Sequence, residues 1–342
     1  MEKIKSNCII PSAAYSVPKS IIKQYAPSNR KRPEVGDLVF GEIHELGHHR
    51  TVESRSARIH TVNIGTRAIF VYGNRYAPDQ YEGLVPDEYK EYVDLFSRGG
   101  VIGDVHNQNQ LIGRASKVHV LGYVCKEDGT VINTRQHVLL KPKNEVRDKP
   151  GAKLILCVGT SMNSGKTETA AACCYALTSM DQQVRAAKIT GTASLKDILL
   201  MNDCGAEYIA DFTYFGHPST YLLELDQLLK MFNDFDLKYG NNPKNYLVIE
   251  FADGIFQRET AMLLKSQEVR NRISKLIFCA PDSSAVYGGL RVLKEEFDLQ
   301  PDAISGLCSS SPLAMREIES FTNLPIIQSM EKDFRKIFAI IG

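Results

Sequence analysis

The residues with the clearest chemical potential lie in one short loop near the middle of the chain. An apolar run over residues 154–158 leads directly into Gly159-Thr160-Ser161-Met162-Asn163-Ser164-Gly165-Lys166-Thr167, and a helix-forming stretch follows from Glu168. The backbone N–H groups of such a loop, with the positive end of the following helix, bind phosphate oxygens. The glycine allows close approach, the lysine adds positive charge, and the threonine hydroxyl can ligate Mg²⁺. The pattern predicts a phosphate-binding loop (P-loop) over residues 159–167.

Charged residues at the ends of three later strand-like runs extend this prediction. Lys188, Asp211 and Glu250 each close such a run, and ligands of parallel α/β sheets gather at the carboxyl ends of the strands. We expect Glu250 and Asp211 to hold Mg²⁺ together with Thr167, because carboxylate and hydroxyl oxygens suit that cation. Lys188 is expected to offset charge on a transferring phosphoryl group or to bind an acidic substrate. The alternatives are a structural carboxylate and a strand-end lysine that reaches solvent.

The predicted catalytic residues are therefore Lys166, Lys188 and Glu250. Asp211 and Asp253 are both weaker candidates than Glu250 for holding the cation. Asp282 is expected to cap a helix, because Ser283 and Ser284 follow it before an apolar helical pattern.

The loop and these strand ends resemble dethiobiotin synthetase and its relatives. The shared features are the Gly-Thr start, the Gly-Lys-Thr end, the lysine at 188 before a small-residue turn, and Glu250 before the glycine-bearing loop at 251–254. The order of motifs is also similar to the molybdopterin-guanine dinucleotide biosynthesis protein B family and to a P-loop family linked to D-glutamate N-acetyltransferases. The resemblance covers about residues 153–330. It implies a magnesium- and nucleotide-dependent ligase or kinase that acts on a small acidic substrate as a homodimer.

The sequence also departs from these families. Thr160 stands where partition and nitrogenase-type ATPases carry a second lysine, which argues against that group. The segment 307–311 has no asparagine of the kind that dethiobiotin synthetase relatives use to read adenine. The resemblance implies ATP as the nucleotide, and this departure from the family pattern keeps GTP open.

Two contrasting textures predict two domains after a basic arm at residues 1–33. Residues 34–145 show short alternating strand-like runs punctuated by glycine, which favour a β-rich barrel or sandwich, with one helix expected at 86–96. A polar linker is expected at 141–151. From 151 to 342, apolar strands alternate with helical patterns, which is typical of an α/β domain with a mostly parallel sheet flanked by helices. Its expected strands are 154–158, 184–188, 208–212, 246–249, 276–279 and 304–307, and its expected helices are 167–180, 222–235, 259–272, 285–297 and 313–321.

One further motif invites a metal assignment. His44-Glu45-Leu46-Gly47-His48 matches the HExxH pattern of zinc proteases, which needs a helix to place both histidines on one face. The segment instead follows a strand-like run and contains a glycine, so we expect a hairpin. Metal binding by His44, His48, His49 or His60 stays open.

Composition limits the partners. The net charge is +1, which provides no global field toward nucleic acid or an anionic membrane, although the basic arm could contact phosphate locally. The eight cysteines are scattered without a CxxC pair, and no run is long enough to span a bilayer, so we expect a cytoplasmic protein without disulfides. Two other functions stay open: a nucleotide-driven switch or ATPase whose β-domain binds a protein or nucleic acid, and an acyltransferase that binds CoA through the loop.

Overall fold

The computed structural model describes residues 1–143, 145–147, 149–329, 331 and 333–342. Asn144 and Asp148, which belong to the expected linker, lie outside the described residues. By their contacts the residues divide into two compact units. The first comprises 1–139, 192–196 and 212–221; the second comprises 140–191, 197–211 and 222–342. The two short segments from the C-terminal half that join the first unit were not expected from the sequence.

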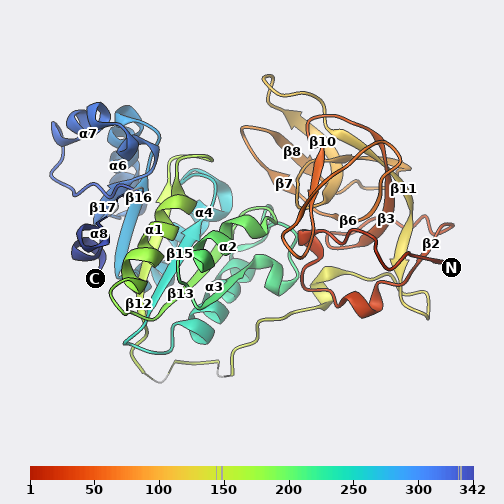
Figure 1. The fold of residues 1–342 in the computed structure, drawn as a ribbon, viewed down its shortest axis with the longest axis horizontal. Helices are drawn as coiled ribbons and strands as arrows, with labels where there is room; N and C mark the ends of the chain where they lie inside the picture. The colour runs from red at the N-terminus through yellow and green to blue at the C-terminus, as the bar shows by residue number, and fades with distance from the viewer. Residues whose placement is uncertain (144, 148, 330, 332) are drawn as a thin grey trace. The chain divides into compact units, whose positions relative to one another are not determined.

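A closed barrel forms the centre of the first unit. Strand β11 pairs with β3 and β9, β3 with β6, β6 with β10, and β10 with β9, so these five strands return on themselves (Figure 1). The β6–β10 pair is parallel, and the other four pairs are antiparallel. Closure removes the exposed edges that an open sheet would present. The strands of the unit are β1 (Glu2–Lys3), β2 (Gln24–Ala26), β3 (Leu38–Glu45), β4 (Thr51–Glu53), β5 (Ile59–Thr61), β6 (Arg67–Tyr72), β7 (Arg75–Tyr76), β8 (Tyr81–Leu84), β9 (Tyr92–Leu95), β10 (Val101–Gln108) and β11 (Ser116–Cys125).

The barrel encloses a hydrophobic core made by alternate residues of its strands. Among the fully buried side chains are Phe70, Tyr72, Leu95 and Val118. The helix expected at 86–96 is wrong, because Tyr92–Leu95 is the strand that closes the barrel between β10 and β11. Three short 3-10 helices, η1 (Ser12–Ala14), η2 (Lys19–Ile21) and η3 (Thr134–Gln136), and a fourth, η4 (Phe212–Phe215), also belong to this unit.

The second unit is a parallel α/β sheet, as the alternation of strands and helices predicted. Six strands lie in the order β14-β13-β15-β12-β16-β17, and every neighbouring pair is parallel. The strands are β12 (Lys153–Gly159), β13 (Val184–Thr190), β14 (Tyr208–Asp211), β15 (Tyr246–Phe251), β16 (Lys275–Cys279) and β17 (Ala303–Ser305). The helices are α1 (Lys166–Thr178), α2 (Leu195–Asp203, which begins in the first unit), α3 (Leu225–Tyr239), α4 (Arg258–Lys265), α5 (Gln267–Arg272), α6 (Ser283–Phe297), α7 (Pro312–Glu319) and α8 (Phe334–Ile341), with the 3-10 helix η5 (Leu307–Ser310).

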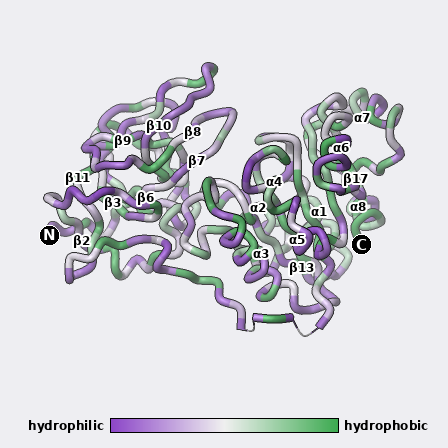
Figure 2. Tube along the Cα trace, turned by 180° about the vertical axis from the view of Figure 1, so that it is seen from behind, coloured by the Kyte–Doolittle hydropathy of each residue, from purple (hydrophilic) through white to green (hydrophobic). Residues whose placement is uncertain are grey.

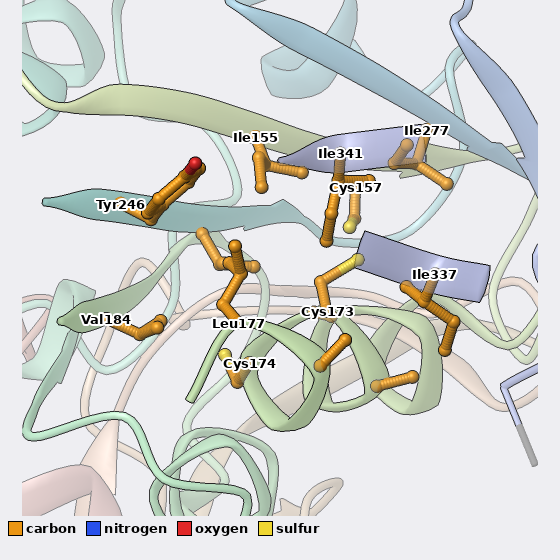
Figure 3. Close-up of a cluster of buried hydrophobic side chains, with 14 of the residues drawn as sticks. Ile155, Cys157, Cys173, Cys174, Leu177, Val184, Tyr246, Ile277, Ile337 and Ile341 are labelled. Atoms are coloured by element: carbon orange, nitrogen blue, oxygen red, sulfur yellow. The ribbon is translucent and has the colours of Figure 1, made fainter. Parts of the chain in front are cut away.

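Helices cover both faces of this sheet. On one face, α1 and α8 pack against strand residues such as Ile155, Val184 and Tyr246, and Figure 3 shows this cluster, with Ile337 of α8 above the helix α1. On the other face, Phe232 of α3 contacts Phe251 of β15, with 6.3 Å between ring centroids. Helix α8 is largely hydrophobic along its trace (Figure 2), which accounts for its burial against α1.

Two predictions about the chain as a whole can be compared with the structure. All eight cysteines are free thiols. Among the helices of the described residues, none combines the length and apolar character needed to cross a bilayer.

Candidate functional site

The loop between β12 and α1 has the predicted strand–loop–helix geometry. Strand β12 ends at Gly159, and α1 begins at Lys166. Gly165 adopts φ 92°, a left-handed conformation that favours glycine, and a Cβ atom there would lie 2.8 Å from Cα of Gly306. A Cβ atom at Gly159 would lie 2.3 Å from Oγ of Ser164. Both glycines are therefore required by the path of the loop.

Neighbouring strands hold the loop in place. The Thr160 amide donates to the carbonyl of Cys279 at 3.0 Å, and the Leu307 amide donates to the carbonyl of Ser164 at 3.2 Å. Thr169, on the first turn of α1, donates its hydroxyl to the carbonyl of Gly165 at 2.8 Å. The loop is thus anchored to β16, to η5 and to its own helix, which pre-organises its backbone amides.

Lys166 lies within the loop rather than in solvent. Its side chain is 5% exposed, and Nζ donates to the carbonyl of Ser161 at 2.7 Å and lies 3.4 Å from Oγ of Ser164. Burial lowers the pKa of Lys166 from its ordinary value, against the opposing charge of Glu250. The ammonium is held by uncharged oxygens of the loop, which an anionic phosphate group can replace with a stronger, charge-assisted contact.

Three of the residues predicted from the sequence stand side by side on adjacent strands. Lys188 of β13 is in register with Asp211 of β14 on one side and with Glu250 of β15 on the other. All three side chains are buried, with exposed fractions of 8% for Lys188, 0% for Asp211 and 1% for Glu250. The carboxyl edge of the sheet therefore brings one ammonium group and two carboxyl groups to the level at which the loop begins.

Direct contacts join this row to the loop. The Thr167 hydroxyl donates to Oε1 of Glu250 at 3.2 Å, and Nζ of Lys188 lies 3.4 Å from the same oxygen. Among the described residues, Oε2 of Glu250 is buried and finds no hydrogen-bond partner. A buried carboxylate oxygen without a donor is costly, so this atom is suited to receive a cation or a ligand group.

The donor set fits Mg²⁺ bound through a nucleotide better than an all-protein metal site. Thr167 and Glu250 offer the hard oxygen atoms that Mg²⁺ prefers. Within the part of the chain that the structure describes, no three His, Cys, Asp or Glu side chains are grouped as a metal site. A cation beside Glu250 would therefore need phosphate and water oxygens to complete its coordination, as Mg²⁺ usually does.

Asp197 belongs to the same cluster and was not predicted. It lies in the first turn of α2 and forms a hydrogen-bonded ion pair with Lys188. Burial alone would lower the pKa of Lys188, but the charges of Asp197 and Glu250 outweigh it and raise that pKa above its ordinary value. A sequence signal existed: Ser194-x-x-Asp197 before an apolar run is the pattern of a capped helix start.

The remaining acidic candidates have distinct surroundings. Asp253 follows β15 with φ 59°, in a loop that packs against the P-loop, because Ile255 donates its amide to the carbonyl of Gly159 at 2.9 Å. Asp282 caps α6, as expected, and accepts the Ala285 amide at 2.8 Å.

The HExxH segment of the first unit does not form a helix. His44 belongs to strand β3, and its ring lies 4.7 Å from that of Tyr92. His48 and His49 follow the strand, with 5.0 Å between their ring centroids. The grouping of metal ligands that zinc proteases need is absent from the described residues.

The three consecutive basic residues at the end of the arm contact groups of their own unit. Arg30 lies over the ring of Tyr89 at 4.4 Å, Lys31 pairs with Asp37 at 2.9 Å, and Arg32 pairs with Asp87 at 2.5 Å. The two ion pairs offset the charge of Lys31 and Arg32, which the sequence alone did not indicate.

No family model and no curated protein matches the chain. Solved structures that show a partial likeness include a ParA family ATPase from Chlorobium tepidum TLS, with 15% identity, a TM-score of 0.34, and coverage of 53% of this chain and 84% of that one. Another is the signal recognition particle receptor FtsY from Elizabethkingia anophelis, with 11% identity, a TM-score of 0.37, and coverage of 60% of this chain and 70% of that one. A third is a nucleotide-binding protein in complex with ADP from Archaeoglobus fulgidus, with 10% identity, a TM-score of 0.36, and coverage of 54% of this chain and 85% of that one.

None of these structures is a dethiobiotin synthetase, so the resemblance to that family is not confirmed. The assignment of a P-loop fold is based on the strand order and the loop geometry described above. On that basis, the second unit has the architecture of a P-loop nucleotide-binding protein.

Proposed function

We propose that the protein binds a magnesium–nucleotide complex, with ATP favoured over GTP, and transfers a phosphoryl group to a small acidic substrate. The observation that carries the proposal is the contact between Thr167 and Glu250, with Lys188 beside the same carboxylate oxygen. It unites the start of the helix that follows the loop with the carboxyl edge of the central strands. P-loop enzymes act mainly by positioning phosphate groups and stabilising their charge, and this arrangement supplies both.

Each residue has a defined part in this proposal. Lys166 and the amides of residues 159–167 would hold the phosphate oxygens, with the positive end of α1 behind them. Thr167 and Glu250 would hold Mg²⁺. Asp211 is a further candidate, and strand β13 separates it from the strand of Glu250. Bound Mg²⁺ would neutralise phosphate charge. Lys188 would offset charge on the transferring group or bind the carboxylate of the substrate.

Lys166→Ala tests the nucleotide site directly. We expect the wild-type protein to bind Mg·ATP with micromolar affinity and the variant to lose about 10- to 150-fold, because a charge-assisted hydrogen bond contributes roughly 1.5–3 kcal/mol. Isothermal titration with ATP, GTP and acetyl-CoA, each with and without Mg²⁺, gives the affinities, and circular dichroism verifies the fold. Lys153→Ala, at the amino end of the same strand β12, is the matched control and should leave binding unchanged.

The same titrations separate the alternatives. Unchanged ATP affinity in Lys166→Ala would refute the assignment of the loop. Acetyl-CoA binding that depends on Lys166, without ATP binding, would favour the acyltransferase function. Salt-dependent binding to RNA would favour a nucleic-acid partner, although the pairing of Arg30, Lys31 and Arg32 does not support one. Light scattering with and without nucleotide tests the expected homodimer.

A further inference from the structure

Lys188 is held by two carboxylates of different kinds. Glu250 also accepts the Thr167 hydroxyl, so it is tied to the nucleotide loop. Asp197 comes from helix α2 and forms the hydrogen-bonded ion pair with Lys188. Asp197 is 21% exposed at its side chain, whereas Glu250 is 2% exposed.

These two carboxylates would respond differently to nucleotide. If Glu250 contacts a divalent cation, its negative charge is shared with that cation, which also repels the ammonium group of Lys188. A buried ammonium without a compensating charge is strongly unfavourable. Asp197 is then the carboxylate that keeps its hydrogen bond to Lys188, while Asp253 contributes a smaller electrostatic attraction. A lysine side chain is also flexible, so a fixed partner decides where its nitrogen lies.

We propose that Asp197 is a positioning residue that holds the Lys188 ammonium at the nucleotide site when Glu250 is engaged by the bound magnesium–nucleotide complex. This inference rests on the proposed function and adds to it a residue that the resemblance did not supply. Asp197 acts through Lys188 and needs no contact of its own with the nucleotide.

The start of α2 is itself fixed from another part of the chain. Glu53 of β4 is 2% exposed, and its carboxylate accepts the amides of Leu195 at 2.9 Å and Lys196 at 3.3 Å. These are the first two amides of α2, which have no partner within the helix. A carboxylate at a helix start also interacts favourably with the helix dipole. Glu53, Leu195 and Lys196 all belong to the first unit, and within it Glu53 satisfies the two amides with which α2 begins.

The test compares Mg·ATP with Mg·ADP. If Lys188 faces the group to be transferred, Asp197→Asn should weaken Mg·ATP about tenfold, the lower end of what one charge-assisted hydrogen bond contributes. Mg·ADP affinity should change less than about twofold. Asp197→Glu should recover part of the ATP affinity, because it restores the charge. Asp203→Asn, at the exposed end of the same helix, is the control and should leave the ATP-to-ADP affinity ratio unchanged.

The outcomes are distinct. An unchanged ratio in Asp197→Asn, or an equal loss of ATP and ADP, would overturn the inference, since a merely structural residue affects both nucleotides alike. If Asp197→Asn does not fold, Asp197→Ser takes its place: a selective loss of ATP supports the inference, and an unchanged ratio overturns it. If the wild-type protein binds neither nucleotide, the proposed function itself is refuted and the inference with it.

Discussion

Gly165→Ala should lower the stability of the second unit, because the backbone of the P-loop leaves no room for a Cβ atom at this position. The substitution adds one methyl group at φ 92°, where the Cβ atom would lie 2.8 Å from Cα of Gly306 and 3.0 Å from the amide nitrogen of Leu307. The left-handed conformation costs a residue with a Cβ roughly 1–2 kcal/mol. The contact adds about 1–3 kcal/mol, because both neighbouring atoms are backbone and cannot rotate away. We expect the free energy of unfolding of this unit to fall by about 2–5 kcal/mol.

Urea denaturation measures this loss. With an m value of about 2 kcal/mol per molar, the middle of the usual range, the midpoint should fall by about 1–2.5 M. The chain has no tryptophan, so circular dichroism, which reports on the helices of this unit, is the suitable signal. Gly288→Ala is the matched control. Gly288 lies within α6, and its added methyl group would meet nothing within 4 Å.

The control should change stability in the opposite direction, since alanine in a helix interior is about 1 kcal/mol more favourable than glycine. The reasoning would be refuted if Gly165→Ala unfolded at the wild-type urea concentration. It would also be refuted if Gly288→Ala lowered the midpoint as much as Gly165→Ala does. A folded Gly165→Ala protein is expected to bind nucleotide more weakly, because the loop must move away from Gly306.

Two further predictions concern packing and pH. Gly289→Ala, next to the control position, should lower the urea midpoint, because its Cβ atom would lie 2.1 Å from the ring of Phe278; a stability equal to that of Gly288→Ala would contradict the packing of α6 on β16. Burial, aided by the charges of Arg75 and His48, lowers the pKa of His49 to about 3. The imidazole of His49 is protonated near its ordinary pKa in the unfolded chain but only near pH 3 in the folded protein. The free energy of unfolding should therefore be highest above about pH 6.5 and decline as the pH falls toward 3. His49→Gln should make the urea midpoint depend less on pH in this range, and an identical profile in both proteins would disprove the assignment.

The parts of the fold that depend on local pattern were predictable. Each of the six strands of the parallel sheet overlaps an expected run, because a strand buried on both faces is a short, continuous apolar segment. The predicted helix at 259–272 is interrupted at Ser266, which separates α4 from α5. Helices α2 and α8 were not predicted. The sequence of α8 is a short apolar segment with no clear helical pattern, and its burial depends on contact with α1, which the sequence does not show.

The barrel was harder to predict because its pairing is not local. Strand β9 has only four residues, and its identity depends on closing the sheet between β10 and β11, which no local pattern reveals. The candidate site shows the same division. Lys188 and Glu250 could be identified from their positions at strand ends, whereas the partnership of Asp197 with Lys188 depends on how α2 returns to the sheet.

The membership of residues 192–196 and 212–221 in the first unit has a consequence for synthesis on the ribosome. A chain that has emerged through residue 139 lacks two of the segments that complete this unit. They emerge only after β12, α1 and β13 have been made. At roughly 5–20 residues per second, the first unit therefore waits several seconds for its last segments, although all strands of the barrel have already been made. During that interval the surfaces that these segments cover are open to chaperones, and the first unit reaches its final form only when translation is well into the second.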